Sequence, residues 1–220
     1  MLSTPFFASM TPPLFSNIYA LGDSHAGTLS PYTNVIPIGP ETMFTMSSGN
    51  RLNDFISLFL STGELKSNAL WMFCFGEIDV RCHIHTQIHE KQRDEDEVIE
   101  TLVDNYFQKI RSVHFPIAIM SVVPPVKIEG NEDKIYYTQK SPYPFIGPDD
   151  DRKRYTKKIN EKLMLLTATH GIPYLDVYSA YVNSEGFLQM EFADKDLIHI
   201  LNRSKVLDLL NENPIFTEYR

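Results

Sequence analysis

Four continuous apolar runs of strand length stand out along the chain, and helical patterns separate them. Runs that are apolar on both faces are typical of buried parallel strands, whereas strands with one solvated face alternate apolar and polar residues. The pattern therefore predicts a mainly parallel sheet of five strands, since a shorter fifth run follows the first four. The runs cover 17–21, 34–38, 69–75, 116–123 and 174–177.

The segments between these runs carry apolar residues at helical spacing. The predicted helices cover 52–60, 95–113, 152–169 and 205–211. Gly171 and Pro173 stop the third helix, because glycine ends a helix readily and proline cannot continue it. Strands that alternate with helices predict an α/β fold, a three-layer α/β/α sandwich, and 220 residues suit a single domain over 1–220.

One segment, residues 124–151, shows no regular periodicity. It combines Pro, Gly, Asn and Asp with four aromatic residues, which are Tyr136, Tyr137, Tyr143 and Phe145. Irregular segments longer than about fifteen residues in a compact domain are usually lids or binding loops. We therefore expect an irregular insertion whose aromatic side chains either shape a substrate cleft or pack as a flap on the domain.

Composition narrows the class of protein. Hydrophobic residues make up 43% of the chain and charged residues 22%, as in ordinary soluble globular proteins. The net charge of −8 argues against a general nucleic-acid binder, which needs a basic surface, and no apolar run is long enough for a membrane span. The N-terminal stretch lacks the positive segment of a secretory signal, and Cys74 and Cys82 are the only cysteines. We expect a cytoplasmic protein with reduced thiols and no nucleic-acid or membrane partner, and the oligomeric state stays open.

The candidate chemistry lies at two places far apart in the sequence. The first strand ends in Gly22-Asp23-Ser24-His25, and Asp196 and His199 follow the last strand. Loops at the carboxyl ends of parallel strands converge on one crevice, so these residues can meet. Turn chemistry alone would explain Gly-Asp-Ser, and Asp-x-x-His is common. Together and in this order, they favour a serine nucleophile, Ser24, with His199 as its base and Asp196 orienting the imidazole.

At these residues the chain resembles the SGNH/GDSL hydrolase family, whose nucleophile block is Gly-Asp-Ser and whose acid and base block is Asp-x-x-His. The resemblance implies the flavodoxin-like fold of that family and an oxyanion hole built from the backbone N–H groups of Ser24 and Gly39. Another family block, Gly-x-Asn-Asp, is matched only in part by Gly76-Glu77-Ile78-Asp79. Ile78 replaces the asparagine that would complete the oxyanion hole.

The residues after the third strand offer a substitute for that asparagine. Glu77, Asp79 and Arg81 lie within five residues of one another, and they either form a fixed ion-pair network or contact the substrate. A guanidinium is a planar donor suited to carboxylates and oxyanions. We therefore expect Arg81 to take over part of the oxyanion role, with Glu77 and Asp79 as further substrate-binding candidates.

Cys82, His83, His85 and His89 raise a metal-binding alternative, because thiolates and imidazoles bind zinc. Their spacing matches no closed structural zinc site. In a strand-like stretch His83 and His85 would share one face and Cys82 the other, whereas at a helix start His85 and His89 would be half-exposed surface groups. We expect no metal and no cofactor.

These observations favour a serine esterase that removes a small acyl group, such as acetyl, from a carbohydrate or a related small molecule. The polar, aromatic segment 124–151 favours such a small-molecule or glycan ester over a long-chain lipid. Two alternatives stay open: an O-acyltransferase that passes the acyl group to a glycan, and a catalytically silent binding module with the same crevice.

Overall fold

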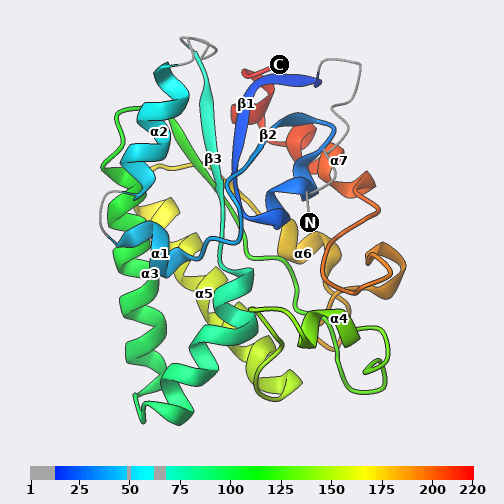
Figure 1. The fold of residues 1–220 in the computed structure, drawn as a ribbon. Coiled ribbons are helices and arrows are strands. Elements are labelled where there is room, and N and C mark those ends of the chain that lie inside the picture. Colours follow the sequence, from blue (N-terminus) through cyan, green and yellow to red (C-terminus); the bar gives the residue numbers. More distant parts are fainter. Residues whose placement is uncertain (1–12, 49–50, 62–67) are drawn as a thin grey trace.

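A sheet of five parallel strands forms the centre of the molecule (Figure 1). The computed structural model describes residues 13–48, 51–61 and 68–220. The strand order is β2-β1-β3-β4-β5, and every neighbouring pair is parallel, which confirms the predicted sheet. The strands are β1 (Phe15–Gly22), β2 (Thr33–Pro37), β3 (Leu70–Cys74), β4 (Ile117–Met120) and β5 (Tyr174–Leu175).

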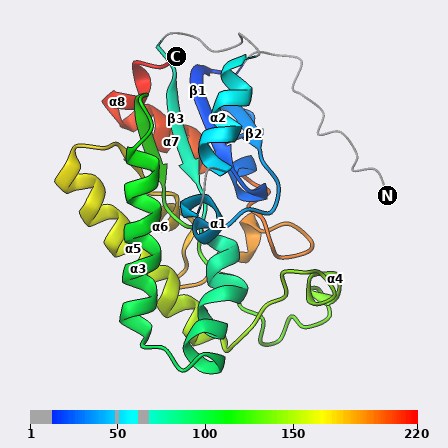
Figure 2. The same cartoon turned by 60° about the vertical axis from the view of Figure 1, so that its left-hand side comes forward.

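Helices cover both faces of the sheet, so the predicted three-layer sandwich is also confirmed (Figures 1 and 2). One face packs against α1 (Met43–Ser47), α2 (Arg51–Ser61), α3 (Glu95–Arg111) and α5 (Asp149–His170). The other face packs against the 3-10 helix η1 (Ser24–Leu29) and against α6 (Val177–Tyr181), α7 (Ser204–Glu212) and α8 (Pro214–Thr217). Among residues 13–48, 51–61 and 68–220, the structure has no helix that is long and apolar enough to cross a membrane.

The two hydrophobic cores explain why the strands read as continuous apolar runs. Along β1, Ile18 and Ala20 belong to the core beneath α7 and α8, while Tyr19 and Leu21 belong to the core beneath α3 and α5. Successive strand side chains point to opposite faces, so a strand covered on both faces is apolar at every position.

The segment after β3 is helical, which contradicts the strand-like interpretation of the cysteine and histidine stretch. Residues 77–90 form an irregular helix that contains two π-helical turns, η2 (Asp79–His83) and η3 (Thr86–Glu90). Val80, Ile84 and Ile88 are spaced four apart and pack into the same core as α3. This apolar spacing is typical of a helix. The polar residues between these three positions made it hard to recognise in the sequence.

The irregular insertion is shorter than predicted. Its last three residues, Asp149–Asp151, form the first turn of α5, where acidic side chains suit the positive end of the helix dipole. The remainder contains one short helix, α4 (Tyr136–Gln139), and lies at the carboxyl ends of the strands (Figure 1). Cys74 and Cys82 are both buried and free of disulfides.

Candidate active site

Ser24 occupies an exposed position at the carboxyl end of β1. Gly22, two residues earlier, lies so close to β3 that a Cβ there would approach the carbonyl oxygen of Cys74 to 2.2 Å. The Asp23 carboxylate then caps η1 by accepting a hydrogen bond of 2.7 Å from the backbone N–H of His25. Asp23 and His25 are buried while Ser24 between them is exposed, so the turn presents the hydroxyl to solvent.

His199 is carried by a tight loop that folds back on itself. An antiparallel bridge pairs Ala193 with Ile200, which places Asp194 directly opposite His199. The backbone N–H of Asp194 donates to the carbonyl of His199 at 2.9 Å. Leu197, at the turn, has a φ of +55°, a left-handed conformation that a leucine adopts only where its surroundings enforce it.

The carboxylate in contact with His199 is Asp194, and this corrects the assignment of Asp196 to that position. Oδ2 of Asp194 accepts from Nδ1 of His199 at 2.9 Å, and Oδ1 accepts from the backbone N–H of Ile198 at 2.8 Å. A spacing of three residues suits a helical turn, but here the chain forms a hairpin, in which residues 194 and 199 are cross-strand neighbours. Asp196 lies near the tip of the loop and lines the same cavity as Ser24.

The hydrogen bond to Asp194 sets the tautomer of His199. A carboxylate only accepts, so Nδ1 carries the ring proton and Nε2 keeps its lone pair. Within the described residues, Nε2 is buried and has no hydrogen-bond partner. Burial and the neighbouring charge of His25 both lower the pKa of His199, so the neutral, proton-accepting form predominates at neutral pH.

His25 is a second buried imidazole beside His199, and no pattern in the sequence indicated a role for it. Its Nδ1 lies 2.9 Å from Oδ1 of Asp23 and its Nε2 lies 3.0 Å from the carbonyl oxygen of Ile198. Both partners are acceptors, so both ring nitrogens donate and the ring is an imidazolium. Burial opposes this charge, but the carboxylates of Glu77 and Asp23 outweigh it and raise the pKa of His25 to about 9. His25 thereby ties the loop of His199 to the turn of Ser24.

The candidate catalytic residues open into one cavity of about 320 Å³. Segment 124–151 contributes part of its wall, and Tyr143 is the aromatic side chain of this segment that lines the cavity. The side chains of Tyr136 and Tyr137 lie outside the described part of the chain, and Phe145 is buried. The lining residues from β-strand loops and the insertion are Ser24, Pro40, Ile78, Arg81, Thr138, Ser141, Tyr143, Asp196, Ile198 and His199.

Arg81 belongs both to an ion-pair network and to the cavity wall. The side chain is buried, and its Nη2 lies 3.2 Å from Oε2 of Glu77, which in turn lies 3.6 Å from Nε2 of His25. Nε of Arg81 has no hydrogen-bond partner among the described residues. The ion pair, one of the two alternatives for these residues, is therefore present between Arg81 and Glu77, and Arg81 also lines the cavity. Glu77 does not line this cavity and acts on it through Arg81 and His25.

Asp79 has a structural position that the sequence did not indicate. Its Oδ2 accepts from the backbone N–H of Met43 at 2.7 Å, so it holds the start of α1, and it does not line the cavity. Burial raises the pKa of Asp79 to about 7, against the opposing effect of these backbone hydrogen bonds. The structure thus assigns this carboxyl to the packing of α1 against the helix after β3.

The oxyanion-hole candidates differ in how the structure places them. Gly39 follows β2 with a φ of +91° and is exposed, and its neighbour Pro40 lines the cavity. Ile78 is buried at the cavity wall, where its side chain offers no donor. The assignment of the backbone N–H groups of Ser24 and Gly39 to an oxyanion stays a prediction.

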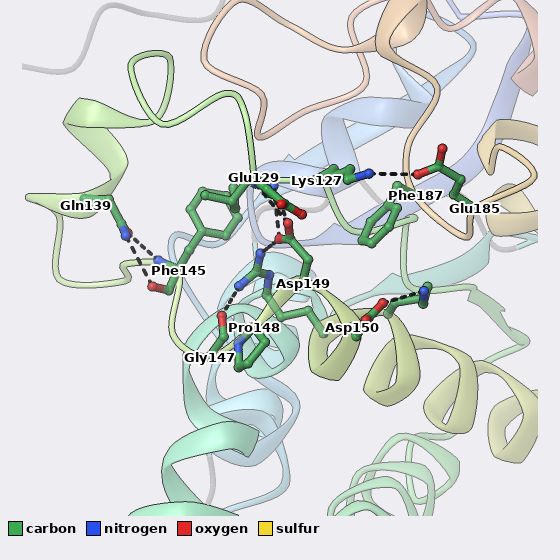
Figure 3. A pocket seen from close by; sticks show the side chains of 13 residues that line it. Lys127, Glu129, Gln139, Phe145, Gly147, Pro148, Asp149, Asp150, Glu185 and Phe187 are labelled. Carbon is green, nitrogen blue, oxygen red and sulfur yellow. Dashed lines mark hydrogen bonds and ion pairs between the residues drawn. The ribbon is translucent and has the colours of Figure 1, made fainter.

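A larger cavity, of about 630 Å³, lies between the insertion and the start of α5 (Figure 3). Two lysines that line it are already paired: Lys127 with Glu185 at 2.9 Å, and Lys153 with Asp150 at 2.6 Å. Asp149 accepts from the backbone N–H groups of Ile128 and Glu129 and pairs with Arg152. No nucleophile with an adjacent base lines this cavity in the described structure, so the smaller cavity is the better candidate.

The four residues considered as metal ligands do not converge. The thiol of Cys82 is buried and donates to the carbonyl of Ile78 at 3.1 Å, and His83 is exposed beside Tyr143. His85 and His89 do meet, because they lie one turn apart on the helix after β3. Their third neighbour is Asp151 of α5.

Comparison with solved structures shows what this fold is similar to. A GDSL-like lipase from Bacteroides thetaiotaomicron has a TM-score of 0.57 at 12% identity over 96% of this chain and 93% of that protein. A Bacteroides fragilis protein, provisionally described as an acylhydrolase, has a TM-score of 0.57 at 17% identity over 92% and 88%. The fold implied by the SGNH/GDSL resemblance is therefore confirmed. No protein-family model and no curated protein matches the sequence.

Proposed function

We propose, from a fold shared with the SGNH/GDSL hydrolases, that this chain is a serine acyl hydrolase that removes a small acyl group from a carbohydrate or related small molecule. The observation that carries the proposal is the state of His199. Its Nε2 has a lone pair and no partner in the described structure, and the residue lines the cavity that exposed Ser24 also lines. An imidazole held in this tautomer by Asp194 can act as a general base toward a hydroxyl nucleophile at the same cavity.

The reaction follows from these positions. Oγ of Ser24 attacks the ester carbonyl and its proton passes to Nε2 of His199, while Asp194 stabilises the resulting imidazolium. The tetrahedral intermediate collapses as His199 returns the proton to the leaving alcohol. Water, deprotonated by His199, then attacks the acyl-serine and releases the carboxylic acid and free Ser24.

The negative oxygen of the intermediate needs hydrogen-bond donors. We assign the backbone N–H groups of Ser24 and Gly39 to this role, each donor being worth on the order of 10²–10³ in rate. Because Ile78 supplies no side-chain donor, the guanidinium of Arg81 at the cavity wall is the third donor.

The cavity favours a small polar ester. Its volume of about 320 Å³ is at the lower end of ligand pockets. Thr138, Ser141 and Tyr143 supply hydroxyl groups along the insertion side, and Arg81 and Asp196 add charge. These groups can bind the hydroxyl groups of a sugar, while Pro40, Ile78 and Ile198 supply apolar surface for a short acyl chain.

The direct test is labelling by a fluorophosphonate, which reacts with activated serines. We expect modification of Ser24 in the full-length protein and its loss in Ser24→Ala. Ser141 lines the same cavity, so Ser141→Ala is the matched control and should label as the wild type does. Absence of labelling at Ser24 in the folded protein would contradict the proposal and favour a silent binding module.

Substrate class is tested separately, with p-nitrophenyl esters of increasing chain length and with acetylated sugars. We expect kcat/KM to fall as the acyl chain lengthens beyond a few carbons. Preference for long chains would contradict the substrate assignment while leaving the serine mechanism intact. Acetyl transfer to an added sugar in preference to water would identify an O-acyltransferase.

A further inference from the structure

A cluster of metal-ligating side chains lies outside the catalytic cavity. His85 and His89 on the helix after β3, together with Asp151 in the first turn of α5, each offer one donor atom, and these atoms lie within 4.8 Å of one another. We propose that this cluster binds one divalent transition-metal ion of the Zn²⁺ class and that the ion joins the helix after β3 to α5.

The separations of the donor atoms suit such an ion. Nδ1 of His85 lies 3.3 Å from Oδ2 of Asp151, and Nε2 of His89 lies 3.7 Å from the same oxygen. A tetrahedral zinc ion with bonds of about 2.0 Å holds its ligands roughly 3.3 Å apart. The three side chains therefore need only small movements to enclose an ion.

The backbone accounts for the convergence of the two imidazoles. His85 and His89 are four residues apart, the spacing at which two histidines on one helix face bind zinc. Their ring centroids lie 4.0 Å apart and the ring planes are tilted by 30°, and His89 lies within the π-helical turn η3. One cation bound by a nitrogen of each ring would hold this arrangement.

The surroundings hold the ligands in place. Oδ1 of Asp151, the oxygen that faces away from the histidines, lies 2.9 Å from Nη2 of Arg154, which lies 2.8 Å from Glu95. Contacts of this kind orient a metal-binding carboxylate. At Gly147 a Cβ would lie 2.3 Å from Nδ1 of His85. Any other residue at position 147 would therefore clash with the imidazole where it now lies.

The donor set selects the class of ion. Two imidazoles and one carboxylate suit Zn²⁺ and its neighbours Co²⁺, Ni²⁺ and Cu²⁺, whereas Ca²⁺ and Mg²⁺ prefer oxygen ligands throughout. His89 is 52% exposed, which leaves room for water to complete the coordination. Since the catalytic residues do not contact this cluster, the ion would act on stability and not on the acyl chemistry.

The test uses the tag-free, full-length protein, stripped with EDTA and dialysed. It is titrated with CoCl₂, followed by visible absorption, and with ZnCl₂, followed by calorimetry. We expect one ion per chain with micromolar or tighter affinity. His89→Gln, a change at a half-exposed position that the fold tolerates, should weaken binding at least tenfold. His83→Gln, an exposed histidine on the same helix, is the matched control and should bind as the wild type does.

Thermal unfolding supplies a second readout. An ion that binds only the folded state raises the Tm. ZnCl₂ should therefore raise the Tm of the wild type and of His83→Gln but not that of His89→Gln or Asp151→Asn. No binding up to about 100 µM, equal affinity in His89→Gln, or loss of binding in His199→Ala would each overturn the proposal. The last result would place the ion in the catalytic cavity.

Discussion

The imidazole rings of His25 and His199 lie 4.9 Å apart, and their surroundings drive their pKa values in opposite directions. Two carboxylates keep His25 protonated, while burial and the charge of His25 disfavour protonation of His199. One buried imidazolium thus helps to keep the neighbouring base free of its proton. The residue next to Ser24, the proposed nucleophile, supplies this charge.

The first prediction concerns the pH dependence of hydrolysis. Because the pKa of His199 lies below the ordinary value of 6.5, kcat/KM should rise with pH along a limb whose midpoint lies below pH 6.5. In His25→Gln the neighbouring positive charge is gone, so the acid limb should move to higher pH. Profiles of kcat/KM against pH with p-nitrophenyl acetate measure the acid limb in the wild type and in His25→Gln. A wild-type limb centred above pH 6.5 would contradict this account.

The second prediction separates the two aspartates near His199. Asp194→Asn should lower kcat by up to about 10⁴, because the amide no longer fixes the tautomer or stabilises the imidazolium. Asp196→Asn is the matched change two residues away, and its effect should be at most tenfold, since Asp196 lines the cavity without holding Nδ1. Equal losses in the two variants, or the reverse order, would return the orienting role to Asp196.

These two aspartates also show how far the sequence determines the site. The parallel five-stranded sheet, the layers and the placing of Ser24 and His199 at one cavity follow from periodicity and from the convergence of parallel-strand loops. The choice of carboxylate does not follow, because it depends on the antiparallel bridge between Ala193 and Ile200, a tertiary feature without a local signal. A second aspartate two positions upstream was the only hint.

The helix after β3 escaped prediction for a different reason. Its apolar period of four was hidden by charged and imidazole side chains that pair within the helix, as Arg81 does with Glu77, or with a residue distant in sequence, as His85 does with Asp151. The role of Asp79 likewise depends on α1, a helix that no clear pattern in the sequence predicted. Polar residues buried by tertiary contacts read as surface residues in a sequence.

The third prediction concerns the stability contribution of Asp79. Its pKa rises from about 4 in the unfolded chain to about 7 in the folded protein. Folding therefore favours the protonated carboxyl. The resulting stabilisation of the folded state is complete below about pH 4 and is lost as the pH rises through 7. Asp79→Asn keeps an acceptor oxygen for Met43 but cannot ionise. Relative to wild type, its free energy of unfolding should increase between pH 4 and 7.

Urea unfolding at several pH values measures this difference. Asp133→Asn, a change at an exposed carboxyl, controls for the loss of one negative charge. If Asp79→Asn and the wild type lose stability in parallel over this range, then Asp79 remains ionised in the folded state and burial does not govern its titration.

The fourth prediction concerns Arg81 as a donor to the oxyanion. Arg81→Lys keeps a positive charge beside Glu77 but loses the planar fork, so kcat should fall about 10-fold to 100-fold while KM stays within a few-fold of wild type. Arg152→Lys is the matched control. Both guanidinium groups are buried against the ring of Phe145, at 5.6 and 5.4 Å, but only Arg81 lines the catalytic cavity.

The kinetic parameters distinguish the possible roles of Arg81. A transition-state contact lowers kcat, whereas a contact with an anionic part of the substrate mainly raises KM. Arg152→Lys should change neither parameter, although both variants lose stability because they disturb buried ion pairs. If Arg81→Lys and Arg81→Met keep wild-type kcat and KM and lower only the Tm, Arg81 serves the ion pair with Glu77. The oxyanion would then depend on backbone donors alone, since Ile78 offers none.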